Sequence, residues 1–194
     1  MLIPLSVRLK CRDILAPLAR VLSSGRVNPN VITVIGFIPA ALAGFAFARG
    51  MVRLAGLFIA VSGVFDLMDG LVARTGNRQT KFGAILDSTV DRYAEIVIFI
   101  GLVVLYMGTL SFYAVILALS GSLMVSYVKA RAEGLGVECE VGLLQRPERM
   151  VIILVGALLG VGYLRWAIWA LAVLSNITAL ERLLKVRSLA GTSK

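Results

Sequence analysis

The sequence contains no histidine, and its two cysteines, Cys11 and Cys139, lie far apart. Zinc sites and disulfide frameworks need clustered cysteines or a cysteine–histidine pattern, so both are disfavoured. Any bound metal must therefore be held by oxygen ligands, which hard divalent cations such as Mg²⁺, Mn²⁺ and Ca²⁺ prefer. Acidic residues are also few, 11 against 20 Lys and Arg, which gives a formal net charge of +9. Such a basic excess indicates nucleic acid or an anionic membrane surface as a partner.

Apolar residues are abundant, at 59% of the 194 residues, and the mean hydropathy is +0.90. Soluble domains are near half apolar, so this excess predicts a polytopic membrane protein. It therefore favours an anionic membrane surface over nucleic acid as the partner of the basic residues. Turn signals separate six apolar stretches, at about 31–48, 54–73, 84–107, 112–130, 150–163 and 166–184. We expect the last two stretches to be joined tightly near 162–165.

The N-terminal segment has a different pattern from the six stretches. Apolar residues recur at helical spacing from Val7 to Leu22, with Arg8, Lys10 and Arg12 on the other side. This pattern predicts an amphipathic helix in the bilayer interface. The predicted fold is all-α and integral to the membrane, with six transmembrane helices preceded by this N-terminal amphipathic interfacial helix. With no internal repeat, we expect one membrane domain over 1–194, the juxtamembrane helix at 1–27 and the six-helix bundle at 28–187.

Basic residues are concentrated on one side of this predicted topology. Most Lys and Arg residues fall in the N-terminal segment, in the loops after the second and fourth stretches, and near the C-terminal end. Arg49, Arg53 and Arg165 are the ones that fall on the opposite side. The positive-inside rule therefore places both termini and the two polar loops in the cytoplasm, as in a multi-pass protein of the cell membrane.

Four aspartates interrupt the apolar stretches. Asp66 and Asp69 are spaced i,i+3 and Asp87 and Asp91 i,i+4, so each pair lies on one helix face. Acids at membrane depth are costly and are functional candidates by default. Four neighbouring carboxylates stay ionised together only beside a strong cation, so we expect one or two divalent metal ions. The alternative is pairing of the acids with nearby cations, namely Arg74, Arg78, Lys81 and Arg92.

Small residues next to the acids leave room for a ligand. Gly70, Ala73 and Gly83 place little or no side chain beside the aspartates. Arg74 follows Gly70 by one helical turn, where its guanidinium can bind a phosphate oxygen. The segment therefore predicts an open acidic pocket that takes a metal and a phosphorylated ligand, rather than a packed helix interface.

The segment as a whole, Asp66-x2-Asp69-Gly70-x2-Ala73-Arg74-x8-Gly83-x3-Asp87-x3-Asp91, resembles the signature of the CDP-alcohol phosphotransferase family. The resemblance implies a six-helix membrane enzyme, usually a homodimer, with a cytoplasmic site. Such an enzyme moves a substituted phosphate from a CDP-linked lipid to an alcohol and releases CMP. It implies two Mg²⁺ or Mn²⁺ ions held by Asp66, Asp69 and Asp87, with Asp91 also near the metal and acting as the general base. Beside Asp66 and Asp69, the implied CDP-lipid site includes Pro29, Asn30, Thr33, Gly70, Ala73, Arg74 and Gly83.

A second group of cations flanks the later stretches. Lys129 ends the fourth stretch, Arg149 opens the fifth, and Arg182 lies near the end of the sixth. Cations next to an acidic metal site indicate an acceptor that carries its own phosphate. The alternative is that they set membrane topology or contact lipid headgroups.

The Ser126–Glu133 and Arg146–Arg149 segments resemble those of phosphatidylinositol-phosphate and archaetidylinositol-phosphate synthases. The resemblance implies that Ser126, Lys129, Arg149 and Arg182 hold the phosphate of inositol phosphate, and that the donor is CDP-diacylglycerol or CDP-archaeol. Glycerol-3-phosphate remains an alternative acceptor. A cation-coupled transporter is disfavoured, because no matching acids lie on the later stretches and no inverted repeat is present.

Overall fold

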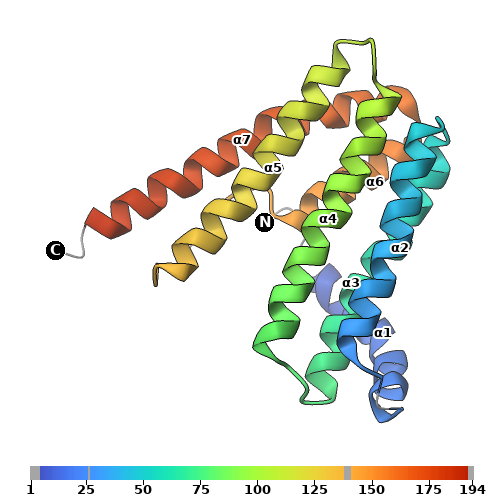
Figure 1. Cartoon of the computed structure of the whole chain (residues 1–194), viewed down its shortest axis with the longest axis vertical. Coiled ribbons are helices and arrows are strands. Elements are labelled where there is room, and N and C mark those ends of the chain that lie inside the picture. Colours follow the sequence, from blue (N-terminus) through green and yellow to red (C-terminus); the bar gives the residue numbers. More distant parts are fainter. Residues whose placement is uncertain (1–4, 26, 138–140, 192–194) are drawn as a thin grey trace. The chain divides into compact units, whose positions relative to one another are not determined.

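The computed structural model describes residues 5–25, 27–137 and 141–191, and within these ranges it consists of helices without a strand (Figure 1). This confirms the all-α prediction. The helices are α1 Leu5–Ser24, α2 Pro29–Ala48, α3 Val52–Thr75, α4 Lys81–Leu105, α5 Ser111–Gly134, α6 Arg146–Leu159 and α7 Val161–Gly191.

Four of the described helices, α2, α3, α5 and α7, are long and apolar enough to cross a membrane. The other two apolar stretches also form helices, but these differ in charge and in length. Helix α4 carries Asp87, Asp91, Arg92 and Glu95. Helix α6 has 14 residues, which extend about 21 Å and so fall short of the roughly 30 Å hydrocarbon core. The protein is thus a multi-pass membrane protein with four candidate spans in its described part.

The chain forms two compact units, residues 3–101 and 102–194. In the N-terminal unit, α2 packs against α3, and Figure 1 shows α4 running alongside α2. Helix α2 begins where Asn28 accepts a 3.0 Å hydrogen bond from the Asn30 amide, with Pro29 in the first turn. A Cβ atom on Gly101 would overlap the backbone of Gly44, so two glycines permit the close approach of α4 and α2.

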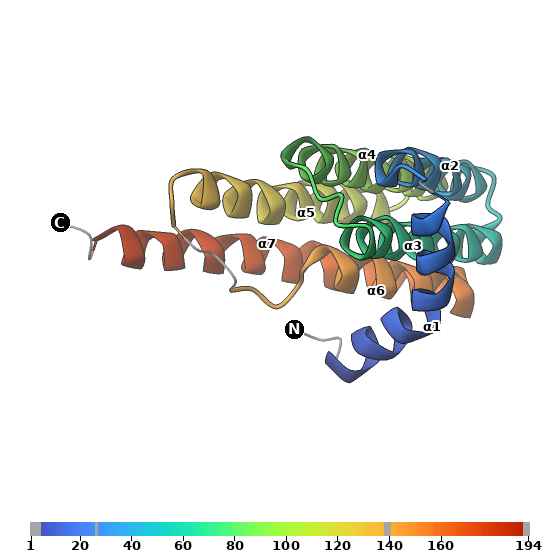
Figure 2. The same cartoon turned by 90° about the horizontal axis from the view of Figure 1, so that it is seen from below.

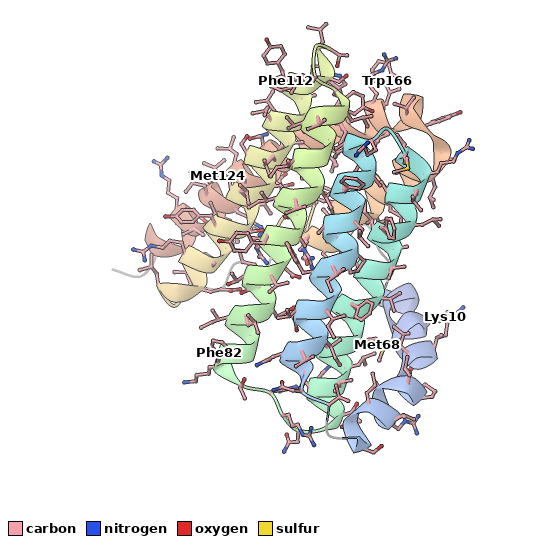
Figure 3. All side chains as sticks on the ribbon, turned by 45° about the vertical axis from the view of Figure 1, so that its right-hand side comes forward. Lys10, Met68, Phe82, Phe112, Met124 and Trp166 are labelled. Carbon is pink, nitrogen blue, oxygen red and sulfur yellow. The ribbon has the colours of Figure 1, made fainter. Side chains whose placement is uncertain are left out.

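Helix α1 packs on α3 through one of its faces. Ala19 is fully buried in a cluster with Met68 and Val72 of α3, and Figure 3 shows Met68 between the two helices. On another face of α1, Ile14, Leu18 and Val21 are each more than half exposed. The apolar residues of this helix are therefore divided between contact with the protein and exposure to its surroundings.

In the C-terminal unit, α5 lies along α7, and α6 also packs against α7 (Figure 2). The Asn176 side chain of α7 donates a 3.0 Å hydrogen bond to the Leu117 carbonyl of α5. Helix α6 ends at Gly160, whose φ of +113° is tolerated by glycine, and α7 begins at the next residue. The predicted tight connection is therefore confirmed, but it lies at Gly160 rather than at 162–165, because those residues already belong to α7.

Candidate active site

Three of the four predicted aspartates come together within the N-terminal unit. One carboxylate oxygen each from Asp66 on α3 and from Asp87 and Asp91 on α4 lie within 4.8 Å of one another. All three residues are partly buried. Oxygens on opposite sides of a Mg²⁺ ion lie about 4.2 Å apart, given Mg–O distances near 2.1 Å. The 4.8 Å limit is slightly wider than this distance, so the three side chains lie close to the spacing around a hard divalent cation, and their donors are all oxygens.

Asp69 is not one of these three and has a separate partner. Its residue is only 6% exposed, and its Oδ2 accepts a 2.7 Å hydrogen bond from the Thr33 hydroxyl of α2. Because α2 and α3 pack against each other, this hydrogen bond joins the two helices. The i,i+3 pair Asp66–Asp69 is thus divided: one member faces the aspartates of α4, and the other is bound to α2.

A cavity of about 270 Å³ lies next to the aspartates within the same unit. It is lined by Pro29, Asn30, Thr33, Asp69, Gly70, Ala73, Arg74, Arg78, Gln79, Thr80, Gly83, Ala84 and Asp87. The cavity therefore brings together all the residues predicted to contact the CDP-linked lipid except Asp66.

Four residues of this lining were missed by the sequence analysis: Arg78, Gln79, Thr80 and Ala84. Three of them belong to the α3–α4 connection, a polar loop with no pattern of its own. Thr80 had a usable signal, because a threonine immediately before a helix is a typical N-cap. The Gly83 amide does donate a 2.9 Å hydrogen bond to the Thr80 hydroxyl.

Two glycines shape the cavity wall. A Cβ atom on Gly70 would lie 3.3 Å from Nη2 of Arg74, so the guanidinium folds back over the bare face of α3. A Cβ atom on Gly83 would lie 3.0 Å from the Thr80 hydroxyl and 3.1 Å from Oδ1 of Asn30. Both glycines thus leave room for polar groups that line the cavity.

Arg92 is a cation close to one of these acids, as the alternative of neutralisation by neighbouring cations requires. Nη1 of Arg92 lies 3.8 Å from Oδ2 of Asp91, and it also donates a 2.9 Å hydrogen bond to the Ser88 carbonyl. The pair is partly solvent-exposed, with side chains 34% and 16% accessible. A long, partly exposed contact of this kind contributes little to stability.

The predicted acceptor residues all lie in the C-terminal unit. Arg182 is 2% exposed; its Nε donates to the Val141 carbonyl at 2.8 Å and its Nη1 to the Val125 carbonyl at 2.6 Å. Arg182 therefore connects α7 to α5 and to the segment before α6. Arg149 is 1% exposed, and its Nη1 donates to the Leu144 carbonyl at 3.3 Å.

Lys129 differs from these two arginines because it is accessible. Its Nζ lies 3.5 Å from Oε1 of Glu133 in an i,i+4 pair whose side chains are 38% and 52% exposed. Ser126, one turn earlier on α5, is partly buried. Exposed helical ion pairs of this kind stabilise by only about 0.3–0.5 kcal/mol, so Lys129 can exchange Glu133 for another anion at little cost.

Residues 26–178 match the CDP-alcohol phosphatidyltransferase family. An archaetidylinositol phosphate synthase of Methanothermobacter thermautotrophicus is 43% identical over 161 residues, covering 81% of this chain and 82% of the relative. A phosphatidylinositol phosphate synthase of Mycobacteroides abscessus is 36% identical over 185 residues, covering 90% of this chain and 84% of the relative.

Solved structures of the Mycobacterium tuberculosis phosphatidylinositol phosphate synthase are also similar. The structure with CDP-DAG bound has a TM-score of 0.82 at 32% identity, covering 90% of this chain and 94% of that one. The complex with manganese and citrate has a TM-score of 0.81, with 88% of each chain covered. The family match, the aspartate signature and these relatives agree, and the chain is an enzyme of the CDP-alcohol phosphatidyltransferase family.

Proposed function

We propose that the protein transfers the phosphatidyl or archaetidyl group of a CDP-linked lipid to a hydroxyl of inositol phosphate. The products are the lipid inositol phosphate and CMP, and the reaction depends on a divalent metal. The observation that carries this proposal is the convergence of Asp66, Asp87 and Asp91 beside a cavity lined by the rest of the signature. The names of the relatives, which are inositol phosphate synthases, support the choice of acceptor.

The metal site consists of the three converging aspartates together with Asp69, which lines the same cavity. We propose that it holds two ions of Mg²⁺ or Mn²⁺. The all-oxygen donor set supports such a metal, and manganese is present in a solved structure of the tuberculosis relative. When bound, the metal neutralises the negative charge of the diphosphate and of the departing CMP.

The residues of the cavity bind and orient the CDP-linked lipid. Asn30 at the start of α2 contacts the nucleotide end, where the absence of a Gly83 side chain leaves space. The Arg74 guanidinium binds a diphosphate oxygen, as its five N–H donors suit it to do. Together these contacts hold the reacting phosphorus in place for attack.

Asp91 acts as the general base. The acceptor hydroxyl oxygen forms a bond to the phosphorus that carries the lipid, the bond from this phosphorus to the CMP oxygen breaks, and the hydroxyl proton passes to the Asp91 carboxylate. Asp91 is suited to this role because its residue is partly exposed and its carboxylate lies beside those of Asp66 and Asp87.

Ser126, Lys129, Arg149 and Arg182 bind the phosphate of the acceptor. The two arginines are buried and already held by backbone carbonyls, so their guanidinium groups are preorganised. Lys129 can bind the same phosphate at a small cost in free energy, because the ion pair with Glu133 that it gives up is exposed. Cations of this kind favour a phosphorylated acceptor over a free alcohol.

In the membrane, we propose a single domain of six spans, in which the short α6 crosses only part of the bilayer on its own and is covered by α7, against which it packs. We propose that both termini and the active site lie on the cytoplasmic side of the cell membrane and that the protein is a homodimer. Helix α1 lies in the interface, with exposed Ile14, Leu18 and Val21 toward the lipid. The basic residues of the N-terminal segment and of the loops after α3 and α5 support this orientation.

The test is CMP release by the purified protein in a lipid bilayer with Mg²⁺ or Mn²⁺, with each acceptor offered in turn. We expect release with inositol phosphate and none with free inositol or serine. Release with glycerol-3-phosphate alone would replace inositol phosphate as the acceptor, and no release with any acceptor would refute the transferase function.

A further inference from the structure

The Thr33 hydroxyl donates to a side chain of another helix, whereas several other hydroxyl groups donate to backbone carbonyls. Ser88, Thr89 and Ser120 donate to carbonyls of their own helices at 2.8–3.0 Å. The Thr33 hydroxyl has such a carbonyl available, that of Pro29 at 3.2 Å, but it lies closer to Oδ2 of Asp69, at 2.7 Å. A hydroxyl has one proton to donate, and the short distance to a carboxylate identifies Asp69 as the acceptor.

We propose that Thr33 is a positioning residue that holds the Asp69 carboxylate in the orientation needed to bind the divalent cation. The inference rests on the proposed function and assigns Thr33 a role toward the metal, in addition to any contact with the nucleotide. A hydrogen bond to Oδ2 fixes the plane of the carboxylate and so sets the direction in which its remaining lone pairs can bind the cation. Partners of metal ligands generally act in this way, and their loss typically weakens metal binding or activity about 10–100-fold.

The packing of α2 on α3 keeps the two residues in register. One turn after Thr33, a Cβ atom on Gly36 would overlap the Cβ atom of Phe65, which precedes Asp69 by one turn. One further turn along, the Ser62 hydroxyl donates a 3.1 Å hydrogen bond to the Gly36 carbonyl. Helices α2 and α3 are therefore in direct contact one turn from the Thr33–Asp69 pair. This contact fixes the separation of the two backbones, and with it the separation of the two side chains.

The hydrogen bond also connects the two ends of the cavity. Thr33 belongs to the same helical start as Pro29 and Asn30, which line the nucleotide end, and Asp69 belongs to the acidic end. A nucleotide that contacts the start of α2 and a cation that binds Asp69 therefore stabilise the same arrangement. We accordingly expect CMP and the metal to strengthen each other's binding, with Thr33 carrying part of this coupling.

The test measures Mn²⁺ binding directly, by electron paramagnetic resonance of free Mn²⁺, with and without CMP. Thr33→Val removes the hydroxyl at nearly constant shape and is expected to raise the Kd for Mn²⁺ about tenfold and to reduce its dependence on CMP. Thr33→Ser retains the hydroxyl and is expected to restore most of the affinity. Ser62→Ala, which removes another hydroxyl bond between α3 and α2, is the matched control and is expected to bind Mn²⁺ as the wild type does.

Wild-type Mn²⁺ affinity and wild-type CMP dependence in Thr33→Val would overturn the inference. If that variant does not fold, Thr33→Ala, which also removes the hydroxyl, replaces it. The variant without the hydroxyl is also compared with Thr33→Ser in an Asp69→Asn background, where the two should bind Mn²⁺ equally. A further loss in that background would show that Thr33 does not act through Asp69. Wild-type protein that binds Mn²⁺ and CMP but releases no CMP from CDP-lipids would refute the proposed function while leaving the role of Thr33 intact.

Discussion

Replacement of Gly83 by alanine separates the stability of the protein from its affinity for the CDP-linked lipid. The added methyl group would lie 3.0 Å from the Thr80 hydroxyl and 3.1 Å from Oδ1 of Asn30. These distances are tighter than ordinary contacts, so both polar groups must shift by a few tenths of an ångström. Since both side chains line the cavity, we expect the substitution to disturb the surface that binds the nucleotide.

The effects on stability oppose each other. Alanine in place of glycine in a helix is favourable by about 0.5–1 kcal/mol. A weakened hydrogen bond between the Gly83 amide and the Thr80 cap, 2.9 Å in the structure, costs about 1 kcal/mol. The net change in unfolding free energy is therefore small, between zero and a loss of about 0.5 kcal/mol.

The effect on substrate binding is not offset. Loss of one or two polar contacts to the nucleotide costs roughly 1–2 kcal/mol, which raises the KM for the CDP-linked lipid about 5- to 30-fold. The assay compares KM for CDP-lipid and for inositol phosphate with the thermal unfolding midpoint. Gly63→Ala on α3 is the matched control, because a Cβ atom added at Gly63 meets no other atom within 4 Å. An unchanged KM for the CDP-lipid in Gly83→Ala would refute the assignment of this part of the cavity to the nucleotide.

Three further substitutions test other parts of the structure. Gly101→Ala places a methyl group against the backbone of α2 and should destabilise the protein by about 1–3 kcal/mol. Gly162→Ala, whose methyl group meets open space, should leave the thermal unfolding midpoint unchanged. Equal unfolding midpoints for the two variants would contradict the close contact of α2 and α4. Arg182→Lys keeps the charge but loses the Nε donor to the Val141 carbonyl. It should raise the KM for inositol phosphate about tenfold and leave the KM for the CDP-lipid unchanged. A larger effect on the KM for the CDP-lipid would show that the basic residues do not bind the acceptor. Asp91→Asn should abolish turnover while retaining Mn²⁺-dependent CMP binding, measured by calorimetry, and an active variant would exclude Asp91 as the base.

Much of the helical order could be predicted because each apolar run is bounded by local signals. Asn28 and Pro29 mark the start of α2 at the residue where the structure begins it. The break between α6 and α7 could not be located in this way. Gly160 is one of several glycines in an apolar region, and its positive φ, which ends α6, depends on how the two helices pack.

The site shows a similar limit. The spacing of Asp66 and Asp69 places them on one face of α3, but residues three apart still differ by about 60° around the helix axis. This angle lets the two side chains face different helices. Asp66 lies beside the aspartates of α4, while Asp69 accepts a hydrogen bond from Thr33 of α2. The partners of Arg182 were equally out of reach, because no pattern in the sequence tells which carbonyl groups an arginine will bind.

The central claim is that a hydroxyl oxygen of inositol phosphate attacks the lipid-bearing phosphorus and displaces CMP. The most direct measurement uses inositol phosphate with ¹⁸O in its ring hydroxyl groups and follows both products by mass spectrometry. The account predicts that the product lipid retains every label of the acceptor and that CMP carries none. Labelled CMP, or a lipid product without the labelled oxygen at its new phosphodiester, would contradict it.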